Sequence, residues 1–317
     1  MKRPSFNGAA ALQFVVNGKA GSSDADATRD AIESGLREAG RTGIIRFAAQ
    51  GELARVAREG AAKALADGSA VVAVGGDGTI NTVAQAAHPA GCAMGVLPEG
   101  TFNYFAREHS VPTDTNEALR WLLAARPEPV QVSAINERIF LVNASVGLYP
   151  DLLQDRERWK ERFGRSRLVA IGAALSTLLR AQDSLRLSFE WEGKLRDVRT
   201  LTLFVGNNRL QLEQLGLGDP GAPAERGAAD GHITAVILKP IGTMAMIGLV
   251  LRGALGQLGD AGGVEHFACH KLVVEPTLTL GRRRVKVAFD GEVEWMRSPL
   301  SIRVLPEPLW LLKVPGA

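Results

Sequence analysis

The sequence predicts an N-terminal α/β domain with a parallel sheet, followed by a larger and mainly antiparallel β domain. From residue 12 to about 125, short β-rich runs alternate with segments of helical spacing, which is typical of a parallel sheet covered by helices. After Pro127 and Pro129 the β-rich runs continue without regular intervening helices, which favours antiparallel pairing. A length of 317 residues suits about two domains. We expect them at 10–128 and 129–312.

Individual elements follow from the same patterns. The expected strands of the first domain are "LQFVVN" (12–17), "GIIRFAA" (43–49), "AVVAVGG" (70–76) and "CAMGVLP" (92–98). Helices are expected at 24–39, which ends before Gly40, and within 51–68. In the second domain, 130–147 reads as two strands around an Asn-Glu turn, and 184–208 as two more around "EGK". Two helices are expected there, at roughly 157–181 and 241–258.

Composition limits the class of protein. Hydrophobic residues make up 46% and charged residues 22% of the chain, and the net charge is +3, so neither disorder nor a nucleic-acid partner is indicated. Cys92 and Cys269 lie in apolar runs without metal-ligand spacing and read as buried thiols. No signal peptide is predicted, and the longest apolar runs fall short of the roughly 20 residues of a membrane span. We therefore expect a cytoplasmic protein.

The segment "GGDGTIN" directly follows a predicted buried strand. Its residues are Gly75, Gly76, Asp77, Gly78, Thr79, Ile80 and Asn81. Ligands of open parallel sheets sit beyond the carboxyl ends of the strands. Glycines there allow close approach of the backbone, and a helix start favours phosphate. Asp77 is a candidate ligand for Mg²⁺ or a metal-bound water, and a tight turn before a helix is the simpler alternative.

Two further loops leave predicted strands at the same edge. "VVNGKAGSS" (15–23) offers Asn17, Gly18, Lys19, Gly21 and Ser22, whereas "LPEGTFNYFARE" (97–108) offers Gly100, Thr101 and Asn103. Each alone is also consistent with an ordinary helix cap. The P-loop motif is absent from the sequence, so the three loops together predict a phosphate site of another kind.

These motifs resemble one known family. "VVNGKAGSS", "GGDGTIN", "LPEGTFNYFAR", "NASVGL" and "FDGE" occur in the order found in the diacylglycerol kinase catalytic-domain family, which includes bacterial lipid kinases and the sphingosine and ceramide kinases. The resemblance extends from about residue 12 to about 312. "GGDGT" is shared with NAD kinases, but its combination with "GTFN" and "DGE" is more specific.

The resemblance implies an ATP-binding α/β domain, a β-sandwich lipid-binding domain and a nucleotide site in the cleft between them. It implies that Thr101 helps bind the nucleotide. It assigns the ATP phosphates to Asn17, Gly18, Lys19, Ala20, Gly21 and to the seven residues from Gly75 to Asn81. It places the proton acceptor in "FDGE", where we favour Glu292 over Asp290. Without the resemblance, "FDGEVEW" reads as a hairpin turn.

Some positions depart from the family pattern. Gly18 stands where Pro is usual, and Phe102 and Tyr104 replace a glycine and an aspartate. Of the paired acids that hold a structural Mg²⁺ in the β domain, only Asp230 remains.

The resulting hypothesis is an ATP- and Mg²⁺-dependent kinase that phosphorylates a hydroxyl of a lipid, such as diacylglycerol, at a membrane surface. An NAD kinase and a non-catalytic nucleotide or lipid sensor are the alternatives. The sequence leaves open whether the protein forms a homodimer.

Overall fold

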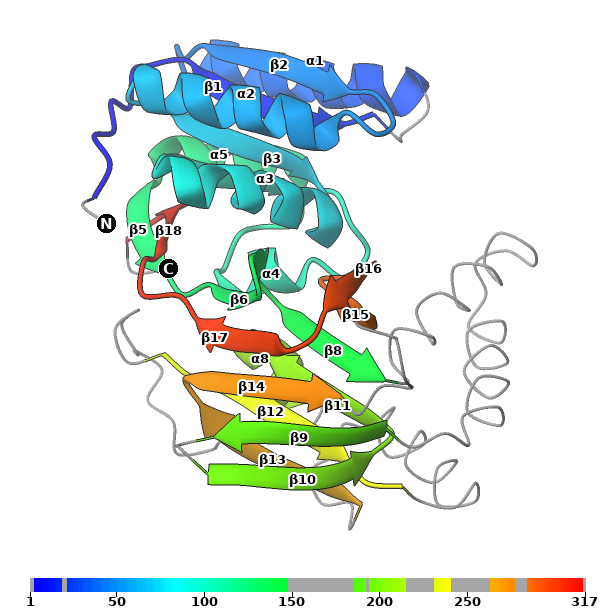
Figure 1. Cartoon of the computed structure of the whole chain (residues 1–317). Coiled ribbons are helices and arrows are strands. Elements are labelled where there is room, and N and C mark those ends of the chain that lie inside the picture. Colours follow the sequence, from blue (N-terminus) through cyan, green and yellow to red (C-terminus); the bar gives the residue numbers. More distant parts are fainter. Residues whose placement is uncertain are drawn as a thin grey trace. The chain divides into compact units, whose positions relative to one another are not determined.

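The computed structural model describes residues 3–18, 22–147, 185–191, 194–214, 231–240, 263–276 and 284–315. These residues form two compact units (Figure 1). The first unit runs to Val132 and resumes at Leu305, and the second comprises the described residues between Ser133 and Val304. This division differs from the continuous ranges 10–128 and 129–312, because the last strand returns to the first sheet. The helices expected at 157–181 and 241–258 lie outside the described residues.

The first unit is an α/β layer structure around a six-stranded sheet of order β2-β1-β3-β4-β18-β5. Its strands are β1 (Leu12–Asn17), β2 (Gly43–Ala48), β3 (Ala70–Gly75), β4 (Ala93–Pro98), β5 (Arg126–Val130) and β18 (Leu309–Lys313). Its helices are α1 (Ser22–Glu38), α2 (Leu53–Ala66), α3 (Asp77–Ala90), α4 (Tyr104–Glu108) and α5 (Thr115–Ala124). Strands β1 to β4 pair in parallel, as the alternating pattern predicts.

Helices cover both faces of this sheet. Helices α2 and α3 pack together against β1 and β3, whereas α1 and α5 pack together on β2 and β4 (Figure 1). Strands β3 and β4 are consequently buried along their whole length, which explains their nearly continuous apolar sequences. The helix boundaries have local causes: the Asp114 side chain accepts a bond from the Glu117 N–H at the start of α5, and Gly91 ends α3 at φ 70°.

The return of β18 completes the sheet from the far end of the sequence. Trp310 pairs with Ala93 of β4 in parallel and with Pro129 of β5 in antiparallel orientation. Leu309, Leu311 and Leu312 are buried there. The apolar side chains of this C-terminal strand therefore belong to the core of the N-terminal unit.

The second unit contains two six-stranded antiparallel sheets. One has the order β10-β9-β14-β17-β6-β7, formed by Lys194–Thr200, Leu185–Trp191, Lys271–Pro276, Leu300–Val304, Ser133–Ile135 and Arg138–Phe140. The other has the order β13-β12-β11-β8-β15-β16, formed by Val264–Cys269, Ile233–Leu238, Thr202–Gly206, Asn143–Gly147, Arg284–Phe289 and Glu292–Arg297. A short helix, α8 (Arg209–Gln214), follows β11.

Alternate residues of both sheets meet in one apolar core. Phe189 and Leu272 enter it from the first sheet, and Val146, Val205 and Val287 from the second. The residues between them point outward, as the period of two in a strand requires. The predicted fold class, a parallel α/β domain plus an antiparallel β-sandwich, is thus confirmed. In the described ranges, every helix is too short or too polar to span a bilayer.

Leu311→Ala tests the contribution of the returning strand to stability. Leu311 is 0% exposed, so the variant should lose about 2–5 kcal/mol of unfolding free energy through lost burial and a cavity. Urea denaturation measures this change. Leu65→Ala is the matched control, because Leu65 lies in the same unit and is 49% exposed. An equally small loss in both variants would contradict a structural role for β18.

Candidate active site

The three predicted loops meet at the carboxyl edge of the parallel sheet in the first unit. The Asn17 side-chain amide, at the end of β1, donates to Thr79 Oγ1 at 3.0 Å. The backbone N–H of Glu99, after β4, donates to the carbonyl of Gly75, at the end of β3, at 3.0 Å. The loops after β1, β3 and β4 are therefore connected directly to one another.

Glycines make this close contact possible. A Cβ on Gly100 would lie 2.7 Å from the Gly76 Cα, and a Cβ on Gly75 would lie 2.7 Å from Thr79 Oγ1. Gly75 also has φ +152°, a backbone conformation that residues with a side chain rarely adopt. The second and third loops thus touch backbone to backbone, without side chains between them.

Helix α3 begins within this contact. Gly76 is its N-cap, and the N–H groups of Thr79 and Ile80 donate to the Gly76 carbonyl. The earlier N–H groups of a helix have no acceptor within the helix, and together with the helix dipole they favour an anion. A glycine-lined backbone surface at the start of a fourteen-residue helix therefore fits a phosphate group.

Asp77 is the first residue of α3 and its carboxylate is partly buried. Burial raises the pKa of this carboxyl group, while the backbone N–H groups of Phe105, Tyr104 and Asn103 act in the opposite direction. The bond from the Phe105 N–H to Asp77 Oδ1 is long, at 3.4 Å. Asp77 therefore ties the start of α3 to the start of α4.

Residues suited to Mg²⁺ are sparse in the described ranges. Nowhere in them do three or more His, Cys, Asp or Glu side chains gather in a metal-binding group. Mg²⁺ commonly keeps several waters and binds through one or two carboxylates plus substrate phosphates. Asp77 fits that mode as a single carboxylate beside a phosphate-binding backbone.

The third loop is closed by Asn103. This residue is buried, has φ 49°, and exchanges two hydrogen bonds with Gly100: its Oδ1 accepts from the Gly100 N–H and its Nδ2 donates to the Gly100 carbonyl, each at 2.9 Å. Thr101 and Phe102, in contrast, are exposed. Asn103 therefore shapes the loop, whereas Thr101 is placed where it can contact a ligand.

Helix α4 is held at both ends. Asp77 bonds to its first turn, and the His109 ring packs edge-on against Phe105 with centroids 4.7 Å apart. Burial lowers the pKa of His109 to about 3, and the charge of Lys313 contributes. A neutral His109 thus packs at the end of α4 at physiological pH.

Two residues that the sequence did not single out take part in the loop network. The Thr28 hydroxyl of α1 donates to the Glu99 carboxylate at 2.9 Å, so α1 is linked to the third loop. Glu99 is part of "LPEGTFNYFARE", but its partner Thr28 lies 71 residues earlier in the chain.

The predicted residues Lys19, Ala20, Gly21 and Asp230 lie outside the described residues.

In the second unit, "FDGE" forms the tight turn between β15 and β16. Asp290 has φ 44° and Gly291 has φ 86°, so the hairpin predicted from the Asp-Gly pair is confirmed. Asp290 is only 6% exposed. It accepts three backbone bonds, from Leu141 at 2.7 Å, Val142 at 2.9 Å and Asn143 at 3.0 Å.

Glu292 differs from Asp290 in its surroundings. It is the first residue of β16 and is exposed. A general base needs an oxygen that can take the proton of the substrate. The three backbone bonds give the Asp290 carboxylate a structural function. Because its oxygens are engaged in this way and Glu292 is exposed, we still favour Glu292 as the proton acceptor. This role remains a prediction.

Comparison with known proteins identifies the family. The model of the diacylglycerol kinase catalytic domain matches residues 11–135. The chain is 31% identical over 221 residues to "Probable lipid kinase YegS-like" of Yersinia enterocolitica serotype O:8 / biotype 1B, covering 66% of this chain and 69% of that protein. It is 32% identical over 296 residues to "Probable lipid kinase YegS-like" of Pseudomonas aeruginosa strain UCBPP-PA14, covering 88% and 90%. The chain belongs to the diacylglycerol kinase catalytic domain family.

A solved structure supports the fold. A diacylglycerol kinase from Bacillus anthracis str. Sterne superposes with a TM-score of 0.70 at 23% identity, covering 97% of this chain and 98% of that one. The predicted family resemblance is confirmed, and membership of a kinase family implies the use of ATP.

Gly100→Ala tests the backbone contact between the second and third loops. The added Cβ would collide with Gly76 and Asn103, so the loops must separate. Affinity for ATP should fall about ten-fold or more, since small displacements in a positioned site are costly. Gly8→Ala is the control, because a Cβ there meets nothing within 4 Å. Calorimetry with a non-hydrolysable ATP analogue measures the difference; equal affinities would contradict the contact's importance.

Asp290→Asn tests the structural function of that carboxylate. An amide can accept fewer of the three backbone bonds, so the free energy of unfolding should fall by about 1–3 kcal/mol. Glu292→Gln, at an exposed position, should change it by less than about 0.5 kcal/mol. Urea denaturation of both variants provides the comparison. An Asp290→Asn variant as stable as the parent protein would show that these bonds contribute little.

Proposed function

We propose that this protein is an ATP-dependent lipid kinase that transfers the γ-phosphate to a hydroxyl of a membrane lipid such as diacylglycerol. The observation that carries the proposal is the glycine-lined junction of three loops at the start of α3, in a chain that belongs to a kinase family. The relatives named as lipid kinases support a lipid as the acceptor.

The first unit binds the nucleotide in this proposal. Backbone N–H groups at the start of α3 hold phosphate oxygens, and Asn17 keeps the first loop against Thr79. Mg²⁺ would neutralise charge on the phosphates of the donor. Asp77 would hold that ion directly or through a water, and exposed Thr101 would contact the nucleotide.

The second unit supplies the acid that activates the acceptor. Glu292 takes the proton of the lipid hydroxyl as its oxygen bonds to the γ-phosphorus. The bond between that phosphorus and the bridging oxygen of ADP breaks, and ADP leaves with the electron pair. The products are a phosphorylated lipid, ADP and a proton, first held by Glu292 and then released. Asp290 acts as a positioning residue that orders Leu141–Asn143 beside the hairpin.

Asp77→Asn and Glu292→Gln test these roles separately. Asn keeps an oxygen for the Phe105 N–H but removes the charge, so turnover should fall about 100-fold or more. Glu292→Gln should lower kcat by about 100-fold or more with little change in ATP affinity. Labelled ATP and a total lipid extract, followed by identification of the product, provide the assay. The double variant should lose less than the product of the two effects if both residues serve one step.

The raised pKa of Asp77 sets the expected pH dependence. If the ionised form is needed, turnover is present above the Asp77 pKa and lost as the pH falls through it. Because burial raises that pKa, the loss of turnover should begin at a pH above the usual range of carboxyl pKa values.

NAD should not be phosphorylated under the same conditions. Transfer to NAD instead of lipid, or ATP binding without transfer to any lipid, would overturn the proposal in favour of an NAD kinase or a non-catalytic sensor.

A further inference from the structure

The third loop carries two aromatic residues beside the phosphate-binding backbone. The rings of Phe102 and Tyr104 are nearly parallel, with 6° between their planes and 5.8 Å between their centroids. Parallel rings at such a distance are offset, so each ring covers only part of the other. Phe102 is 45% exposed. A single exposed apolar residue is common on a protein surface, so the location of this pair is what indicates a site. We call these two residues the aromatic pair.

The turn that carries Phe102 is held against the start of α3. Gly100 contacts Gly76, the N-cap of α3, backbone to backbone. The two hydrogen bonds between Asn103 and Gly100 close the turn, and Thr101 and Phe102 are exposed between these ends. Because consecutive Cα atoms are about 3.8 Å apart, the Phe102 Cα lies within roughly 8 Å of the Gly100 Cα.

The other member of the aromatic pair belongs to an anchored helix. Tyr104 is the first residue of α4. Asp77 bonds to the first turn of that helix, and the His109 ring packs against Phe105 at its far end. Phe102 therefore stacks on a ring whose helix is fixed to the phosphate-binding unit. A contact that is ordered in advance loses less conformational entropy when a ligand binds.

A flat apolar surface beside a phosphate site suits the base of a nucleotide. Phosphate groups bound at the start of α3 leave the ribose and base to extend over a neighbouring loop. The ribose separates the base from the phosphates by a distance comparable to that between Phe102 and Gly100. Aromatic side chains stack on any base, because every base has a π-face. An acyl chain has no such face.

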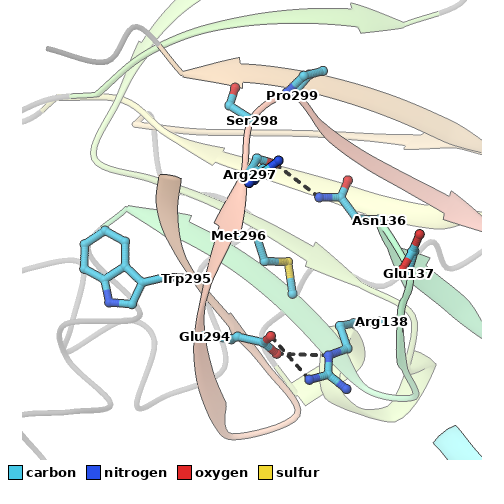
Figure 2. Close-up of a pocket in the computed structure, with 9 residues that line it drawn as sticks. All are labelled: Asn136, Glu137, Arg138, Glu294, Trp295, Met296, Arg297, Ser298 and Pro299. Atoms are coloured by element: carbon cyan, nitrogen blue, oxygen red, sulfur yellow. Dashed lines mark hydrogen bonds and ion pairs between the residues drawn. The ribbon is translucent and has the colours of Figure 1, made fainter. Parts of the chain in front are cut away.

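The cavity in the second unit is a weaker candidate for a binding site. It has a volume of about 570 Å³ and is lined by the β6–β7 turn, β16 and the residues that follow β16. Two of its lining residues, Arg138 and Glu294, form an ion pair at 3.0 Å, and the Asn136 side chain donates to the Arg297 carbonyl (Figure 2). These groups bind one another, so they indicate no particular ligand.

We propose that the aromatic pair stacks on the base of the nucleotide donor, with Phe102 in contact with the base and Tyr104 holding the Phe102 ring in place. Phe102 and Tyr104 stand where the family pattern has a glycine and an aspartate, neither of which could stack. The inference rests on the proposed function in one respect: the phosphates of the donor are held at the start of α3. It adds the residue that makes the site prefer a nucleoside triphosphate to a bare polyphosphate.

Binding of two ligands tests the aromatic pair without depending on kinase activity. The full chain is titrated by calorimetry with a non-hydrolysable ATP analogue and with inorganic tripolyphosphate, each in the presence of Mg²⁺. Phe102→Ala should lower the affinity for the ATP analogue about ten-fold or more, as expected for the loss of one stacked base. The affinity for tripolyphosphate should not change, because tripolyphosphate has no base. The corresponding GTP analogue should show the same loss as the ATP analogue, since stacking requires no particular base.

Two further substitutions of Phe102 separate stacking from burial of an apolar group. Phe102→Trp keeps a flat aromatic ring and should retain the affinity for the ATP analogue. Phe102→Leu keeps a large apolar side chain without a ring and should lose affinity as Phe102→Ala does. Leu65→Ala is the matched control, because Leu65 lies in the same unit and is 49% exposed; it should bind both ligands like the parent protein. A Phe102→Leu variant with the parent's affinity would overturn the stacking proposal.

The remaining outcomes distinguish this inference from the proposed function. If the parent protein binds the ATP analogue through Phe102 but phosphorylates no lipid, the proposed function fails and the aromatic pair stands. If it phosphorylates a lipid and Phe102→Ala leaves the affinity for the ATP analogue unchanged, the function stands and the inference fails. A Phe102→Ala variant that changes only the KM for lipid would place the pair at the acceptor instead. An equal loss of affinity for both ligands would show a disturbed phosphate site, and this result would also overturn the inference.

Discussion

The parallel pairing of β3 with β4, which continues to the bond from the Glu99 N–H to the Gly75 carbonyl at 3.0 Å, fixes the distance between the ends of these strands. With that bond in place, Gly76 and Gly100 approach so closely that neither could carry a side chain without displacing the other loop. The start of α3 is thereby held open beside two glycine-rich turns. The capacity to bind phosphate depends on this spacing, because the donors are backbone N–H groups whose positions follow from the strands.

Two Asp-Gly pairs in this chain illustrate how surroundings decide the function of a carboxylate. Asp290 is buried and accepts three short backbone bonds, so its charge is used to order Leu141–Asn143. Asp77 is only partly buried, and its bond to the Phe105 N–H is long, at 3.4 Å. A partly exposed carboxylate near a phosphate site can hold a cation, whereas a buried carboxylate that accepts three short backbone bonds orders the chain around it. The residue type alone does not distinguish them.

The sequence predicted what depends on local pattern. Alternating runs placed β1 to β4 within a residue or so, and the glycines after β3 indicated a loop of special geometry. The return of β18 was not predicted, since "LWLLK" finds its partners more than a hundred residues earlier, at Ala93 and Pro129. The bonds of Asp290 were missed for the same reason: its acceptor role depends on backbone groups 147 to 149 residues away.

The spacing of Glu292 and Trp295 fixes their relation to each other through strand geometry. Residues an odd number of positions apart point to opposite faces of a strand, and three positions span roughly 10 Å. An acid on one face of β16 and a tryptophan on the other therefore keep a fixed relation, because both are part of one paired strand. A loop could not provide this constraint, since its residues can reorient independently. In β16 the constraint depends on the pairing register, because a shift of one residue would exchange the two faces of the strand.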